Sequence, residues 1–455
     1  MPDAVASAQM RGVEQFGYKQ ELKRALTTKD LVVYGMIFMV PIAPYAVFGF
    51  VWHDSKGMVP LAYLVGLVGM FFTAMSYAAM SRAFPMAGSV YSYAQRGLSD
   101  LAGFFAGWLI LLDYILVPAL LYIVSAVALR PLVPTAPAWL WLVGFIAFNA
   151  IVNVIGIQLT ARVNRYMLAM ELAVLALFLV FGLVALYAGQ GAGRLTLTPV
   201  YDPSAFSIAT VAGATSIAVL SFLGFDGIST LAEETQGGRN CVGRATLLSL
   251  GLVGVLFIVQ TWIAADLAHG MRFSSAETAF YEITERAGGI WLRRATLLAV
   301  VISSGIANAM AAQAAVSRIL FAMARDGKLP SLLAKVHRRF RTPHISTLIV
   351  AGVSLVVGLV FAQRLDDLSR IVNFGALTSF LLLHLAVINH YFVRARSGDW
   401  LRHVLFPLLG FAVIAYVLYE MDRSAKLMGA CWIAAGIIYY VVLTFVLKKS
   451  ASLEL

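Results

Sequence analysis

The chain carries little charge for its length. Only 13% of its 455 residues are charged, while 60% are hydrophobic. Soluble domains contain roughly 25% charged residues, so this composition excludes an ordinary soluble protein. It predicts an all-α membrane protein whose single domain crosses the bilayer many times. The formal net charge of +11 is explained by cations in the loops and gives no reason to expect a nucleic-acid partner.

The residue types that build catalytic and metal sites are also scarce. The two cysteines, Cys241 and Cys431, form no disulfide framework. The seven histidines show no ligand spacing beyond a loose pair, His384 and His390. The sequence contains no nucleotide-binding loop, so ATP drive would need an ATPase subunit, and none is evident. We expect no catalytic residue, no metal site and no cofactor, and we place a membrane enzyme or a receptor below a transporter.

Hydrophobic runs define the predicted membrane spans. A helix that crosses a bilayer needs about 20 apolar residues, and the sequence predicts twelve such helices. They are Leu31–Trp52, Leu61–Phe84, Ala102–Leu129, Ala138–Ile155, Tyr166–Tyr187, Thr210–Leu231, Ala245–Leu267, Ala295–Leu320, Ile345–Phe361, Ile371–Phe392, Val404–Tyr419 and Leu427–Leu447. Residues 1–28 are polar and basic, show no cleavable signal peptide, and are expected to form a cytoplasmic tail. Residues 448–455 form a short C-terminal tail.

The distribution of Lys and Arg orients these spans. With both termini in the cytoplasm, the inner segments hold 23 of the 34 Lys and Arg residues and the outer loops hold 11. Because cationic loops stay on the cytoplasmic side, this bias predicts a multi-pass protein of the cytoplasmic (inner) membrane with both termini inside. The densest cluster, between Arg325 and Arg341, lies in one inner loop, where it also fits contact with anionic membrane lipid.

Two of the predicted spans are interrupted near their centres. Leu31–Trp52 contains Pro41 and Pro44, and Thr210–Leu231 contains the run Ser221–Gly227, in which an aspartate stands beside glycines. Proline removes a backbone hydrogen bond from a helix. Freed backbone is tolerated at membrane depth only where it is buried in protein or lines a cavity. One interrupted span in each half therefore predicts a secondary transporter whose binding site lies at the two interruptions.

The interruptions also divide the chain. If span six begins a second unit, each unit has five spans and the second must be inverted, as in the 5+5 inverted repeat of LeuT-type transporters. The predicted transport core is 29–393, with repeat one at 29–187 and repeat two at 210–393. Residues 394–447 then add helices eleven and twelve to that core.

Three motifs resemble the amino acid–polyamine–organocation (APC) superfamily. They are Pro85–Tyr93, then Ser317-Arg318 with Met323–Gly327, Pro330 and Arg341–Pro343, and finally Ser221–Asp226 leading to Glu233–Thr235. The resemblance covers nearly the whole chain and implies a transporter of small amines or amino acids. Within the superfamily, the chain resembles bacterial putrescine importers at Gly107-Trp108, Leu111–Tyr114, Gly213–Thr215 and Asn373–Leu377.

The chain departs from the patterns of these transporters at positions that bear on which substrate it binds. The putrescine importers carry an aspartate in span one where this chain has Ala46, and prolines where it has Gln236 and Gly243. Putrescine itself therefore stays open. Amino-acid carriers of the superfamily place a Gly-Ser/Thr-Gly stretch at the span-one break, where N–H groups bind the substrate carboxylate. Here Pro41–Ala43 stands in its place, and proline donates no N–H. This favours an amine over an amino acid, unless Pro41 is only a kink that leaves enough donors.

The breaks and motifs give a predicted substrate site. An ammonium group is bound by carboxylates, carbonyl oxygens or aromatic faces. The predicted contacts are Val40, Pro41, Ile42, Ala43, Tyr45, Tyr114, Phe222, Phe225, Asp226 and Phe374, with Tyr114 and Phe222 favoured by their motifs. Asp226 is either a functional intramembrane acid or the N-cap of the second half-helix. Asp113 points about 100° away from Tyr114 around the helix and either pairs internally or supports the site.

Glu171, in span five, is the predicted coupling residue. Proton-coupled amino-acid carriers of the superfamily have a lysine at the equivalent position. Burial favours the protonated form of a carboxyl group, so Glu171 is predicted to carry a proton. The alternatives are a bound cation such as sodium, or a salt bridge to Arg162 or Arg165. Ser303, Ser304 and Asn308 in span eight are either supporting polar groups or small residues for helix packing.

These residues together predict the function. The chain is expected to be a secondary active transporter that imports a small organic amine, a polyamine or a monoamine, with protons. Import or exchange of an amino acid is the alternative within the same superfamily.

Overall fold

The structure is a computed structural model that describes residues 26–86, 89–155, 161–236, 240–325, 327–340 and 342–446. Helices are the only regular elements longer than a single bridge in these ranges. Most of the predicted N-terminal tail and all of the predicted C-terminal tail lie outside the described residues. The helical composition agrees with the all-α class that the sequence predicts.

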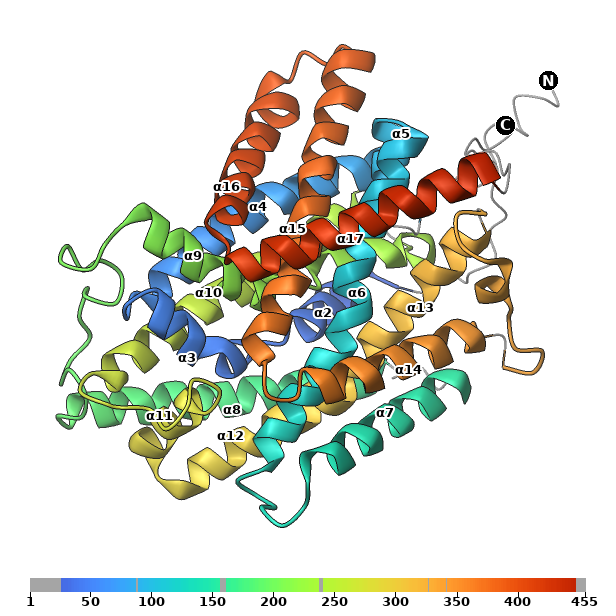
Figure 1. The fold of residues 1–455 in the computed structure, drawn as a ribbon. Helices are drawn as coiled ribbons and strands as arrows, with labels where there is room; N and C mark the ends of the chain where they lie inside the picture. Colours follow the sequence, from blue (N-terminus) through green and yellow to red (C-terminus); the bar gives the residue numbers. More distant parts are fainter. Residues whose placement is uncertain are drawn as a thin grey trace.

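Most elements follow one another with short connections, and a long loop joins α8 to α9 (Figure 1). In chain order they are α2 (Thr28–Met39), α3 (Pro44–Asp54), α4 (Val59–Ala83), α5 (Ser89–Gly97), α6 (Asp100–Leu129), α7 (Ala138–Ile155), α8 (Ala161–Tyr187), α9 (Ile208–Ala218), η2 (Val219–Phe222), η3 (Phe225–Glu234), α10 (Cys241–Ala268), α11 (Ala279–Gly288), α12 (Ile290–Ile302), η4 (Ser303–Asn308), α13 (Ala309–Arg325), η5 (Ser331–Ala334), α14 (His344–Val360), α15 (Leu365–Val387), η6 (Ile388–Arg394), η7 (Leu401–Leu405), α16 (Phe406–Glu420), α17 (Arg423–Val441) and η8 (Val442–Val446).

Short polar residues set the starts of several membrane helices. Thr27 and Asp30 form a reciprocal capping box at the start of α2. Ser99 accepts a backbone N–H at the start of α6, and Ser207 does the same for α9. Each side-chain oxygen satisfies one of the N–H groups that have no partner in the first turn of a helix. The long apolar segments therefore begin where the sequence provides a cap.

Ten helices among the described residues are long and apolar enough to cross a membrane. An eleventh span results if α2 and α3, which are bent by 54° at their junction, are counted as one. The predicted ninth span corresponds to α14, an apolar helix of 17 residues, which is shorter than the roughly 20 residues of a typical span. The chain is thus a multi-pass membrane protein with ten or eleven spans by length and composition, and the count of twelve stays a prediction.

The centre of the molecule is built around α6, which packs against α5, α12, α13, α14 and α15 (Figure 1). On another side, α10 packs against both α2 and α4. The bent pair α2 and α3 lies between these groups, with η3 against α2 and α9 against α3. The two interrupted segments therefore meet inside the bundle.

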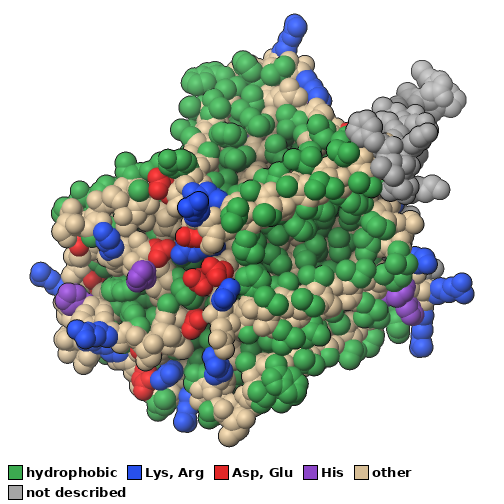
Figure 2. All heavy atoms as spheres, viewed as in Figure 1, with side chains coloured by type: hydrophobic (Ala, Val, Ile, Leu, Met, Phe, Trp, Pro, Cys, Tyr) green, Lys and Arg blue, Asp and Glu red, His purple; other side chains and the backbone are tan. Residues whose placement is uncertain are grey.

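The outer surface is strongly apolar where helices face outward. Figure 2 shows a broad area of hydrophobic side chains over α7, α14 and α17, with charged side chains gathered to either side of it. These helices carry large exposed hydrophobic residues, among them Ile151 of α7, Val356 of α14 and Ile438 of α17. Soluble monomers rarely expose an apolar area of this extent, whereas a membrane protein is expected to expose such an area to lipid.

Candidate functional site: a cavity between two broken helices

The first interruption separates α2 from α3. Helix α2 ends at Met39, Val40 has a φ of 55°, and α3 begins at Pro44. Proline is well suited to the first position of a helix because that N–H needs no helical partner. Gln260, from α10, donates an N–H bond of 2.9 Å to the freed carbonyl of Pro41. The predicted break in the first span is confirmed, and its backbone is satisfied from a neighbouring helix.

The second interruption follows α9. The chain tightens into a 3-10 turn at η2, passes through an extended Leu223, and starts η3 after Gly224, whose φ is 111°. Asn373, from α15, donates an N–H bond of 2.7 Å to the carbonyl of Ser216 just before the break. The predicted break near Phe222–Asp226 is confirmed, and again an amide side chain from another helix supports it.

Replacing Gly224 with alanine is expected to destabilise the protein by about 2 kcal/mol. Its φ lies in a region that side chains disfavour, and a Cβ there would lie 2.3 Å from Cδ1 of Phe38. The matched control is Gly213→Ala in α9, where the nearest neighbouring atom would be 3.8 Å away and alanine is the better helix former. Thermal unfolding of the purified protein measures both. If Gly224→Ala unfolds at the temperature of the control, the break does not depend on this glycine.

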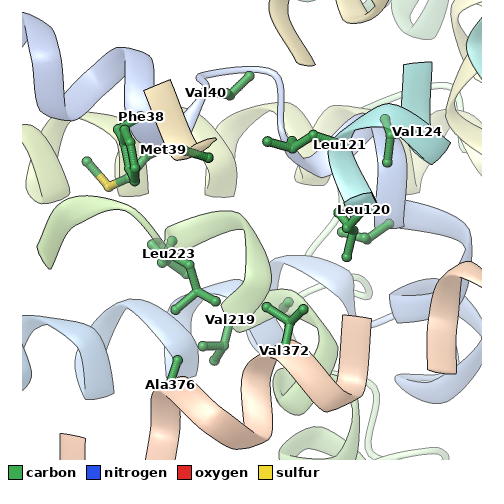
Figure 3. Close-up of a cluster of buried hydrophobic side chains, with 14 of the residues drawn as sticks. Phe38, Met39, Val40, Leu120, Leu121, Val124, Val219, Leu223, Val372 and Ala376 are labelled. Carbon is green, nitrogen blue, oxygen red and sulfur yellow. The ribbon is translucent and has the colours of Figure 1, made fainter. Parts of the chain in front are cut away.

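A cavity of about 80 Å³ lies between the two interruptions. Its walls come from the α2–α3 junction, the middle of α6, the η2–η3 turn, and the run from α12 through η4 to α13. The lining residues are Phe38, Met39, Val40, Ile42, Ala43, Ala46, Val47, Asp113, Tyr114, Val117, Leu120, Leu121, Val124, Leu220, Ser221, Leu223, Gly224, Asp226, Val300, Ser304, Asn308 and Ala312. Figure 3 shows part of this wall, with Leu121 of α6 beside the non-helical segment at Val40. The space is larger than one water molecule requires.

Asp226 is held at one end of the cavity by two hydrogen bonds. It accepts an O–H bond of 2.7 Å from Tyr114 and an N–H bond of 3.3 Å from Gly224. The N-cap of η3 is Gly224, and Asp226 lies inside the first turn of η3, so the interpretation of Asp226 as the N-cap is wrong. The same carboxyl group lines the cavity.

Asp113 is the second carboxyl group of the cavity, and it lies beside the first. It directly precedes Tyr114 in α6, and its side chain is 3% exposed. Despite the predicted angle between them, both residues line the cavity. Asp113 makes no hydrogen bond or ion pair with any residue that the structure describes. A buried carboxylate without a partner is energetically costly, so this group is poised for a ligand that supplies positive charge.

The rest of the lining provides no cation. The described residues around the cavity include no lysine, arginine or histidine. Backbone donors are also few, because Ala43, Tyr45 and Ala46 each donate to a carbonyl three residues earlier, and the two prolines of the break have no N–H. An anionic group beside the α2–α3 junction would therefore meet two carboxyl groups and few backbone donors.

The structure brings together many of the predicted site residues. Val40, Ile42, Ala43, Tyr114, Asp226, Asp113, Ser304 and Asn308 line the cavity. Pro41, Tyr45, Phe222, Phe225 and Phe374 do not line it.

The aromatic side chains outside the cavity pack between helices instead. Tyr45 stacks on Phe280 with ring centroids 3.9 Å apart. Phe222 and Phe225 are fully buried against aromatic rings of neighbouring helices. Phe374 contacts α17 so closely that a Cβ added at Gly429 would lie 2.1 Å from it. These four rings stabilise the helices that form the walls.

Several apolar lining residues were not predicted. On α6 they are Val117, Leu120, Leu121 and Val124. They continue from Tyr114 at steps of three and four residues, the spacing that places side chains on one face of a helix. That periodicity was visible in the sequence and identifies the face once Tyr114 is chosen.

Glu171 lies in α8 and is completely buried. Ser303 donates a short hydrogen bond to Oε1 of Glu171, and Oε2 has no partner among the described residues. Arg165 is exposed, while the side chain of Arg162 lies outside the described residues. The glutamate is thus bonded to the eighth predicted span.

A π-helical stretch, η4, gives the serines of this span different directions. Ser303 contacts Glu171, whereas Ser304 and Asn308 line the cavity. Inserted π turns are rare and are frequent at functional sites. The hydrogen-bond partner of Glu171 and two cavity-lining residues therefore lie in one short segment, η4.

Comparison with known proteins identifies the family. The family of amino acid permeases matches residues 31–450. The chain belongs to this family. Its membership in the APC superfamily, which the motifs suggested, is confirmed, and the chain is a transporter rather than an enzyme.

Relatives of known function match along nearly their whole lengths. The low-affinity putrescine importer PlaP of Escherichia coli (strain K12) is 32% identical over 437 residues, which cover 93% of this chain and 94% of PlaP. The branched-chain amino acid permease BcaP of Bacillus subtilis (strain 168) is 24% identical over 449 residues, covering 93% of each chain. The methylthioribose transporter of the same organism is 24% identical over 453 residues, covering 92% and 93%. These relatives are named for different substrates, so the substrate of this chain has to be inferred from the residues of its own cavity.

Proposed function

We propose that this permease imports a small organic amine across the cytoplasmic membrane. The observation that carries the proposal is the unpaired Asp113 in a cavity that also contains Asp226 and no basic side chain. An ammonium group would stabilise the charged form of the Asp113 carboxyl group, in a cavity that Asp226 and Tyr114 also line. Charge-assisted hydrogen bonds of this kind are about twice as strong as neutral ones.

The same cavity disfavours an α-amino acid. Its carboxylate would need several backbone N–H groups or a cation, and the α2–α3 junction offers few free donors. Placing a carboxylate near Asp113 and Asp226 would add repulsion to the cost of desolvation. The relative PlaP is a putrescine importer and so belongs to the proposed class. The relative BcaP is a branched-chain amino acid permease and represents the alternative, in which this chain imports or exchanges an amino acid.

We propose in addition that import is coupled to protons through Glu171. The carboxyl group is buried, and its hydrogen bond to Ser303 connects it to the span that lines the cavity. Protonation would remove the cost of a buried charge, and release of the proton would restore it. Binding of sodium at the same place is the alternative that the coupling experiment below distinguishes.

The proposal includes the finer architecture of the transporter. We infer twelve spans, with α14 as the ninth, arranged as a LeuT-type inverted repeat followed by α16 and α17. The two breaks, each supported by an amide from a later helix, favour this arrangement. The excess of Lys and Arg in alternate loops favours both termini inside.

Amines are expected to bind better than their parent amino acids. Purified protein would be heated with tyramine or tyrosine, with isoamylamine or leucine, and with putrescine or ornithine. A ligand at 100 times its Kd stabilises the folded state by about 2.7 kcal/mol, so the amine of each pair should raise Tm and the amino acid should not. Equal or larger shifts with the amino acids would contradict the proposed function.

A further inference from the structure

Two polar side chains at the other end of the cavity have no hydrogen-bond partner among the residues that the structure describes. Ser304 and Asn308 line the cavity and are each 7% exposed. Neither forms a hydrogen bond from its side chain with any residue in the described part of the chain. Buried amides and hydroxyls are almost always hydrogen-bonded, and leaving them unpaired is costly. These groups therefore await a hydrogen-bonding ligand.

Their distance from the carboxyl groups follows from how α6 packs on the eighth predicted span. A Cβ at Gly107 would lie 3.1 Å from Met323, and one at Gly305 would lie 2.6 Å from Ser125. The two helices therefore run in opposite directions. Interpolating between these two contacts, with a rise of 1.5 Å per residue, places Asn308 and Asp113 roughly 13 Å apart in the direction of the axis of α6.

The wall between the two ends is apolar. Val117, Leu120 and Leu121 on α6, with Leu220 and Leu223 from the second break, line the cavity there. Among the described residues, the lining around Ser304 and Asn308 includes Val124 and Val300 but no acidic side chain. Glu171 is hydrogen-bonded to Ser303 and does not line the cavity. A second ammonium group at this end would therefore meet no carboxyl group on the cavity wall, which is strongly unfavourable for a buried charge.

We infer that the substrate is a monoamine that carries a neutral hydrogen-bonding group, such as a hydroxyl, at the end opposite its ammonium group. This inference rests on the proposed function and narrows it. Asp113 binds the ammonium group, the apolar wall contacts the carbon chain, and Asn308 with Ser304 binds the neutral group. A terminal diamine and an ω-amino acid fit this arrangement less well, because each places a second charge beside Asn308.

A matched ligand series tests this directly. Butylamine, 4-aminobutan-1-ol, putrescine and 4-aminobutanoate share one carbon chain and differ only in the far group. Titration calorimetry on the purified full-length protein should rank 4-aminobutan-1-ol first, about tenfold tighter than butylamine, with putrescine and 4-aminobutanoate weaker than both. The series is repeated with three, five and six carbons, because the optimal length is set by the separation of the two ends.

Variants of Asn308 assign the effect to this residue. Asn308→Leu should remove the advantage of the hydroxyl, so that the amino alcohol and the alkylamine bind alike. Asn308→Asp should make the diamine the tightest ligand. Tightest binding of the diamine by the unaltered protein at every length, or a hydroxyl advantage that survives Asn308→Leu, would overturn the inference while leaving amine import intact. Failure of every amine to bind would overturn the proposed function itself.

Discussion

Replacing Asp113 with asparagine is expected to abolish amine binding. The substitution keeps the size of the side chain but removes the one buried carboxyl group that has no partner among the described residues. Breaking a buried charge pair costs about 3 kcal/mol or more, which corresponds to binding at least about 100-fold weaker. The stability of the ligand-free protein should stay the same or rise, because a neutral amide replaces a buried carboxyl group that no described residue pairs with.

The control lies on the same helix. Asp100 is in the first turn of α6, outside the cavity, and Asp100→Asn should leave the affinity within about twofold, as expected for a substitution away from the site. Calorimetry and thermal unfolding of both variants separate binding from folding. If Asp113→Asn binds amines as tightly as the unaltered protein, the carboxyl group is structural and Asp226 becomes the next residue to examine.

Replacing Glu171 with glutamine is expected to uncouple transport from the proton gradient. Glutamine keeps the shape and the acceptor for Ser303 but cannot take up or release a proton. In proteoliposomes, the unaltered protein should accumulate amine faster when the outside is acidic. Glu171→Gln should lose this pH dependence and all net accumulation, while amine binding and exchange of internal for external amine continue.

Two comparisons make the result specific. Glu420→Gln, at the end of α16, removes a glutamate outside the cavity and should leave the pH dependence unchanged. Replacing sodium with potassium in the buffer tests the alternative ion. Unaltered gradient coupling in Glu171→Gln would make this residue structural, and uptake that requires sodium at every pH would contradict proton coupling.

The breaks in the helices were predictable where the residues at the break themselves prevent a regular helix. Pro41 and Pro44 break α2 from α3 because proline lacks an N–H, and Gly224 permits a φ that other residues avoid. The π-helical stretch at η4 was not predictable, since nothing in Ser303–Asn308 excludes an ordinary helix. Its formation depends on what neighbouring helices offer, including the contact of Ser303 with Glu171.

The site was predictable in part for the same reason. The sequence placed Tyr114 and Asp226 in one site, and the structure joins them by a hydrogen bond. It did not predict that Phe222 and Phe225 turn toward other helices. The 3-10 geometry of η2 and η3 advances about 120° per residue, against about 100° in an α-helix. Side-chain directions after such a break cannot be obtained from α-helical periodicity.

The position of Asp113 could not be predicted from the sequence. Its angle from Tyr114 around α6 suggested that only one of them would face the substrate. The cavity, however, is lined by the α2–α3 junction and the η2–η3 turn as well as by α6, and both adjacent residues line it. The width of a cavity depends on how helices pack and is not contained in the pattern of any one of them.

Uptake of a labelled amine in competition with its parent amino acid tests the central claim most directly. Proteoliposomes containing the full-length protein would receive labelled tyramine with an acidic exterior, and unlabelled tyrosine would be added as competitor. We predict that tyramine accumulates, that excess unlabelled amine blocks its uptake, and that tyrosine does not. Accumulation of labelled tyrosine by the same vesicles, with no uptake of tyramine, would contradict the account and make the protein an amino-acid carrier.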